Sequence, residues 1–168
     1  MDHAKYKLAE RQVERLTGNR LVDQLDLYDD FRALWLEVRE DLANGARVTF
    51  DADQLRSDSF DLSTPLGLIS VSRSFALVDN AIQPVALFTS RYGDGSSERT
   101  RNLLAVYLSS EVIWKDSIGN EYATDSYTDK VPGFRAIAMI RAAMAVQLLD
   151  ETARCLSFGD VKRSSLFT

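Results

Sequence analysis

The sequence predicts an α+β protein with two N-terminal helices, an antiparallel meander of five or six strands, and a long C-terminal helix packed on the sheet. Apolar residues recur at helical spacing near the N-terminus and alternate with polar residues in the middle of the chain. The links between the expected strands are too short for parallel crossovers, which indicates an antiparallel sheet. At 168 residues, 45% of them apolar, the chain suits one α+β domain over residues 1–168.

The first helix is expected over residues 4–17, within a helical arm formed by residues 1–19. Gly18 is its predicted C-terminal cap. The apolar stripe is narrow and suits packing against one other helix, either of this chain or of a partner. It consists of Tyr6, Ala9, Val13 and Leu16.

The second helix is expected over residues 27–42, with Asp23 or Asp26 as its N-cap and Gly45 at its end. Its charged residues are mostly acidic, whereas residues 133–168 are mainly basic, so the two regions should attract each other within the chain or across a dimer. Its apolar arc comprises Leu27, Tyr28, Phe31, Leu34, Trp35, Val38 and Leu42.

Six segments carry strand patterns, and a polar loop with Pro65 separates the first from the second. Ser70 and Ser72 interrupt the apolar pattern, which predicts a bulge or a break near them. In the two central strands both sets of alternate positions are apolar, so we expect both faces of the sheet to be covered. The segments are residues 47–51, 67–78, 84–92, 101–109, 111–115 and 120–124.

A third helix is expected over residues 133–149, where Arg141 falls on the more apolar side, between Phe134, Ile137, Ala145 and Leu148. A buried guanidinium must be paired or must face a cavity, because burial of a lone charge is very unfavourable. The structural reading pairs Arg141 with a carboxylate at the rim of the sheet, or lets its guanidinium reach solvent past the apolar stem of the side chain. The candidates are Asp79, Asp116 and Asp125.

The functional reading gives Arg141 a ligand. A guanidinium offers a rigid fork of donors to an anionic group, and aromatic side chains would contact the apolar part of the molecule. The candidate ligand-binding residues are therefore Arg141, Tyr107, Arg91 and Trp114. An enzyme that uses carboxylate and tyrosine acid–base chemistry in the same cavity is a further alternative.

No catalytic residues, metal ligands or cofactors are predicted. His3 is the only histidine and lies near the N-terminus, so a nucleophile has no well-placed base. The glycine-rich segment 91–101 lacks the ending of a phosphate-binding loop and suits a hairpin. The acidic segment 121–129 lacks histidine, cysteine and the EF-hand glycine, which favours a solvated loop over a metal site.

Composition predicts the cellular location of the protein and excludes some classes of partner. The net charge of −5 does not suit a binder of duplex nucleic acid. Cys155 is the only cysteine and the first residues have no apolar signal segment, so we expect a cytoplasmic protein. Residues 133–149 are too short and too charged for a membrane span.

The function expected from these features is that of a non-enzymatic interaction or adaptor protein, which forms a homodimer and binds a protein partner. The two apolar sheet faces, the narrow stripe of the first helix and the segregated charge favour it. The alternative is a binder of a partly apolar, anionic small molecule, with Arg141 as the anchor. Residues 157–168 are expected to form a flexible tail.

Overall fold

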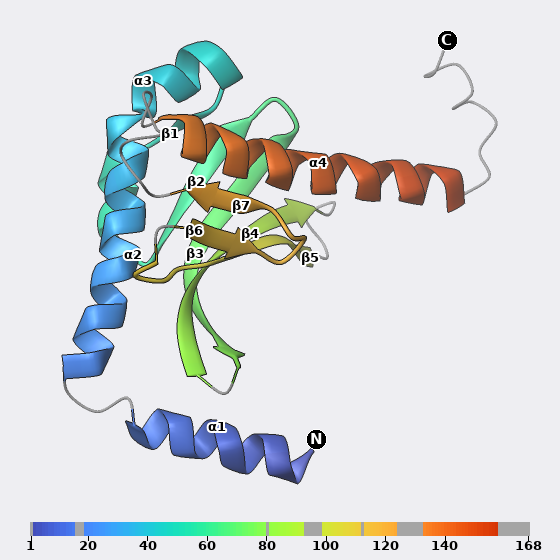
Figure 1. Ribbon diagram of the computed structural model, residues 1–168. Helices are drawn as coiled ribbons and strands as arrows, with labels where there is room; N and C mark the ends of the chain where they lie inside the picture. Colours follow the sequence, from blue (N-terminus) through green and yellow to red (C-terminus); the bar gives the residue numbers. More distant parts are fainter. Residues whose placement is uncertain are drawn as a thin grey trace.

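The computed structural model describes residues 2–15, 19–79, 81–92, 99–111, 113–123 and 133–157 (Figure 1). The predicted class is confirmed, because helices precede an antiparallel meander and a long helix follows it. The elements are α1 (His3–Arg15), α2 (Asn19–Glu37), α3 (Arg39–Asp41), η1 (Leu42–Ala46), β1 (Thr49–Phe50), η2 (Ala52–Arg56), β2 (Ser59–Thr64), β3 (Gly67–Val78), β4 (Ala81–Tyr92), β5 (Arg99–Tyr107), β6 (Ile113–Asp116), β7 (Glu121–Ala123) and α4 (Gly133–Ser157).

The strands form one sheet in which each strand pairs with its sequence neighbours, in the order β1 to β7. The sheet has seven strands rather than five or six, because β2 lies in the segment expected to be a loop. In β2, Phe60 and Leu62 are buried, and they alternate with the polar residues Ser59, Asp61 and Ser63. This alternation is typical of a strand with one face in the core and the other exposed to solvent.

β3 is a continuous strand, so the bulge predicted within it is wrong. Its serines occupy alternate positions and share one face of the sheet, which we call the serine face (Ser70, Ser72 and Ser74). Ile69 and Val71 point to the opposite face, the core face. The register shift of the sheet lies instead between β4 and β5, after Phe88.

A single hydrophobic core lies on the core face, where α2 and α4 pack against the strands and against each other (Figure 1). We expected both faces of the sheet to be covered, but α2 and α4 cover the core face. On the serine face Leu87, Ala105 and Tyr107 are half-buried, whereas Val85 is buried. The core-facing set of the central strands is completely buried and consists of Ala86, Phe88, Leu104, Val106 and Leu108.

Aromatic side chains dominate the contact between α2 and the sheet. Trp35 is fully buried, and its ring lies 5.6 Å from that of Phe60 and 6.1 Å from that of Phe88. Of the predicted arc, Leu27 is half-buried and all the others are buried, so the predicted face is confirmed. Such rings contribute packing energy in edge-on and tilted geometries beyond the area that they bury.

The ends of the second helix differ from the prediction. α2 begins at Asn19, before both predicted N-cap residues, and ends at Glu37. Val38 then leaves the helical region, with φ −105° and ψ 8°. After the π-helical turn η1, Arg47 rather than Gly45 adopts the left-handed conformation, with φ 54°.

Arg141 is exposed on α4, so its predicted burial is wrong. The helix turns another side toward the core, and Leu148, expected beside Arg141, is 52% exposed. The buried positions are Ala136, Met139, Ile140, Ala143 and Gln147.

The carboxylates proposed as partners of Arg141 have other surroundings. Asp116 is held within the β6–β7 turn, and Asp79 is exposed at the β3–β4 turn. Asp125 lies outside the described residues, as do residues 16–18 and 158–168. None of the described helices combines the length and apolarity needed to cross a membrane.

Candidate functional site

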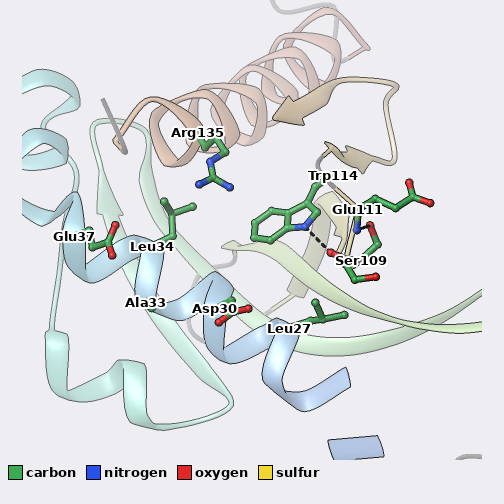
Figure 2. Close-up of a pocket in the computed structure, with 10 residues that line it drawn as sticks. Leu27, Asp30, Ala33, Leu34, Glu37, Ser109, Glu111, Trp114 and Arg135 are labelled. Atoms are coloured by element: carbon green, nitrogen blue, oxygen red, sulfur yellow. Dashed lines mark hydrogen bonds between the residues drawn. The ribbon is translucent and has the colours of Figure 1, made fainter. Parts of the chain in front are cut away.

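An open cleft of about 520 Å³ lies between α2, the segment that joins β5 to β6, and the start of α4 (Figure 2). α2 and the first turn of α4 form two walls, and the β5–β6 segment with Trp114 closes the third side. The cleft is lined by Leu27, Asp30, Ala33, Leu34, Glu37, Ser109, Ser110, Glu111, Trp114 and Arg135.

The α2 wall follows from helical spacing. Asp30, Ala33 and Glu37 lie along one exposed strip, while the buried Leu34 turns toward the core. Ala33 has the smallest side chain of this strip and therefore leaves a depression between the two carboxylates. The helix thus presents negative charge beside apolar surface.

Trp114 forms the opposite wall and is only 5% exposed. Its Nε1 donates a 3.0 Å hydrogen bond to the carbonyl oxygen of Ser109, which fixes the orientation of the indole (Figure 2). The ring of Phe31 supports it from the core, with the two centroids 6.1 Å apart. An indole held from two sides is a preorganised binding surface.

Arg135 extends from the first turn of α4 into the cleft (Figure 2). The centre of its guanidinium lies 5.6 Å from the centroid of the Trp114 ring, a cation–π distance. This contact joins α4 to β6 and leaves the half-buried cation near the acidic wall of α2.

The electrostatic balance of the cleft is negative, because three lining carboxylates face one guanidinium. Asp30, Glu37 and Glu111 are all exposed at its rim. The apolar surface between them comes from Leu27, Leu34 and Trp114. The arrangement suits a positively charged group on an apolar stem, since the stem can pack on the wall while the charge stays among the carboxylates.

The residues predicted to bind a ligand do not share one cleft. Trp114 lines the cleft just described, whereas Arg91 lines a second cleft of about 420 Å³. Neither cleft has Tyr107 or Arg141 in its lining. Tyr107 is half-buried in β5, opposite Val85 of β4.

The second cleft belongs to the serine face and is mostly polar. It is lined by Gln54, Ser57, Ser59, Phe60, Asp61, Ser70, Ser72, Thr89, Arg91 and Thr100. The hydroxyl of Ser70 already donates a 2.5 Å hydrogen bond to Oδ1 of Asp61. That bond joins β2 to β3 across this face, so the carboxylate has a role within the sheet.

Sequence reasoning did not name Arg135 as a site residue, although it expected the acidic second helix to attract the basic residues of 133–168. The segregation of charge was the useful signal. The structure places the basic Arg135 of α4 beside the acidic strip of α2 within the same chain, as that segregation suggests. The small Ala33 between Asp30 and Glu37 was the second signal.

Over the described residues, no group of three or more histidine, cysteine, aspartate or glutamate side chains is arranged to hold a metal ion. The central part of the glycine-rich segment, residues 93–98, and most of the acidic segment, residues 124–129, lie outside the described ranges. Comparison of the chain with protein-family models, curated proteins and solved structures found no match.

Proposed function

We propose that this protein is a non-enzymatic, cytoplasmic interaction protein of the adaptor type, and that the cleft between α2 and α4 binds a basic segment of a protein partner. The observation that carries the proposal is the exposed acidic rim around the fixed indole of Trp114. The excess of negative charge over the whole chain adds a longer-range attraction for such a partner.

A lysine or arginine side chain of the partner matches the cleft in both of its parts. Its methylene groups pack against the half-buried Leu27 and the accessible edge of Trp114, and its charged end lies near Asp30 and Glu37. Exposed ion pairs contribute only about 0.2–1 kcal/mol each, so the partner must offer several basic residues for useful affinity. Binding should therefore weaken as the salt concentration rises.

The anionic small molecule is the less favoured alternative. Its proposed anchor, Arg141, is exposed on α4, and the cleft that contains Trp114 is rimmed by carboxylates. An anion would meet repulsion from Asp30, Glu37 and Glu111 in that cleft.

The proposal is tested with a fluorescent synthetic peptide of alternating arginine and leucine, and binding is measured by fluorescence anisotropy. The cleft variant is Asp30→Asn with Glu37→Gln. The control variant, Glu40→Gln with Asp41→Asn, removes the same charge from exposed positions outside the cleft. We expect the cleft variant to bind about tenfold more weakly and the control to change by less than about twofold.

A rise from about 50 mM to about 500 mM NaCl should weaken binding to the unmodified protein. Equal losses in the cleft variant and the control would show that the peptide follows net charge alone and would overturn the proposal. Peptide binding that neither variant changes would overturn it as well.

A further inference from the structure

The outer half of the β3–β4 hairpin extends beyond the rest of the sheet (Figure 1). β2 pairs with β3 only from Gly67 to Ser72. From there to Val78, the ladder partner of β3 is β4 alone. Among the described residues, no strand pairs with residues 74–78 on the side away from β4, and we call this segment the β3 edge.

The main chain of the β3 edge is oriented for pairing. The amide of Arg73 donates to the carbonyl oxygen of Asp58, so Arg73 directs its main-chain groups away from β4. Because these directions alternate along a strand, the N–H and C=O groups of Phe75 and Leu77 also point away from β4. In the described part of the chain, the elements that pack extensively against β3 are β2 and β4.

The β3 edge exposes large apolar side chains and lacks the features that prevent pairing with another strand. Phe75 is 43% exposed and Leu77 is 41% exposed, and both lie on the same side of the strand. Residues 74–78 contain no charge and no proline, and their ladder with β4 has no bulge. Charges, prolines and bulges are the features by which monomeric proteins block their edge strands.

The opposite edge of the same hairpin is protected. Pro84 of β4 has no N–H, and its carbonyl oxygen accepts a hydrogen bond from the amide of Leu108. Helix α1 also packs against β4. Within the described ranges, an open strand edge therefore lies on the β3 side of the hairpin.

We propose that the β3 edge pairs in antiparallel fashion with the β3 edge of a second copy of this chain, so that the two sheets join into one across a two-fold axis. The edge is self-complementary, which favours a second copy. Residues 74–78 carry no charge, so two copies of the edge meet without repulsion. In an antiparallel arrangement the outward main-chain groups of Phe75 and Leu77 in one copy meet those of Leu77 and Phe75 in the other.

The register follows from the main-chain directions. With the axis beside Ala76, Phe75 of each copy lies opposite Leu77 of the other, and the two exchange main-chain hydrogen bonds. The same pairing collects the exposed Phe75 and Leu77 side chains of both copies into one apolar cluster. The ion pair of Arg73 with Asp58, at 2.8 Å, marks the end of the paired segment.

The interface uses none of the residues that line the α2–α4 cleft, so dimer formation and peptide binding can be tested separately. The mass in solution is measured by light scattering over a range of concentrations. We expect the unmodified protein to approach twice the chain mass of 18.9 kDa. Leu77→Lys and Leu77→Pro should each return it to the mass of one chain, because one places like charges across the axis and the other removes an edge N–H.

Leu148→Lys is the matched control, since Leu148 is also about half exposed but lies on α4. It should leave the dimer intact. Circular dichroism establishes that each variant is folded. An unmodified protein that stays at 18.9 kDa up to about 100 µM would overturn the proposal, since a stable dimer forms well below that concentration. So would folded Leu77 variants that remain dimeric.

The register is tested by oxidation of single-cysteine variants in a Cys155→Ser background. Ala76→Cys should give a disulfide-linked dimer, because the two copies of residue 76 face each other as a non-hydrogen-bonded pair. Ser74→Cys lies on the same edge but opposite Val78 of the second copy, so it should cross-link at least about tenfold more slowly. Equal cross-linking of the two variants would contradict this register.

Discussion

The hydroxyl of Tyr122 donates a 2.6 Å hydrogen bond to Oδ2 of Asp116, one turn away from it in the β6–β7 hairpin. The same carboxylate accepts hydrogen bonds from the amides of Ile118 and Asn120, at 3.0 Å and 2.8 Å. The side chain of Asn120 donates a further bond of 2.9 Å. A buried carboxylate satisfied in this way organises the whole turn.

Tyr122→Phe should lower the free energy of unfolding by about 1–2 kcal/mol, because a charge-assisted hydrogen bond is lost. Asp116→Ala should have a larger effect, since it leaves several donors of the turn without their acceptor. Urea unfolding of the two single variants and the double variant gives the coupling energy, expected at about 1 kcal/mol. A coupling energy near zero would mean that this bond does not stabilise the fold.

Stability should fall in alkali, between about pH 10 and pH 12. Burial raises the pKa of Tyr28 from 10.0 to about 12, although the guanidiniums of Arg32 and Arg73 oppose the shift. Burial and the bond to Asp116 raise the pKa of Tyr122 as well. A raised pKa in the folded state means that the protonated phenol is stabilising; its contribution is complete below pH 10 and is lost as the pH rises through the folded-state value.

The measurement for this prediction is urea unfolding at several pH values from 8 to about 12. Tyr28→Phe should make the alkaline loss of stability smaller. Tyr6→Phe serves as the control, because Tyr6 is 48% exposed, and it should leave the pH profile unchanged. Identical profiles for Tyr28→Phe and the unmodified protein would contradict the prediction.

The two substitutions of Trp35 should differ strongly in their effect. Trp35→Ala removes a fully buried ring between those of Phe50, Phe60 and Phe88 and should cost about 3–5 kcal/mol. Trp35→Phe keeps most of the packing and also removes the Nε1 donor, which is buried with no acceptor among the described residues. It should cost less than about 2 kcal/mol. Thermal unfolding of both variants checks this, and equal losses would show that the phenyl ring recovers none of the lost packing.

Gly67 and Gly45 differ in whether the backbone conformation requires glycine, so alanine substitutions at the two positions can be compared. Gly67 begins β3 with φ +110°, so Gly67→Ala should destabilise the protein by about 1–3 kcal/mol. Gly45 lies in η1 without a positive φ, and a Cβ there would meet nothing within 4 Å. Gly45→Ala should be neutral or stabilise by about 0.4–1 kcal/mol. Urea unfolding distinguishes them, and a Gly67→Ala variant as stable as Gly45→Ala would refute the assigned strain.

The spacing of apolar residues predicted the buried face correctly where large apolar side chains lie on one side of an element. The arc that includes Phe31 and Trp35 identified the core face of α2, because large apolar residues recur there at helical spacing. The same reasoning failed for Arg141, since several sides of α4 are apolar and its packing against α2 and the sheet determines which one is buried. β2 was missed because its two apolar residues stand among serines and aspartate that suit a loop equally well.

The cleft could be predicted only in part. Attraction between the acidic second helix and the basic C-terminal third was expected from the distribution of charge, and it corresponds to Arg135 beside the strip of Asp30 and Glu37. The place of Trp114 in that cleft depends on the register of β6 with β7, where it pairs with Tyr122. Such a register is a tertiary property that no local pattern contains.

The nearest-neighbour order of the strands has a consequence for how the chain folds. Every ladder can form by closing a short loop between consecutive strands, so the sheet can grow hairpin by hairpin at little entropic expense. The contact between α2 and α4 is different, because it closes a loop that contains the entire sheet. We therefore expect the meander to form first and the docking of α4 to complete the core last, so that the core becomes fully cooperative only when both helices are in place.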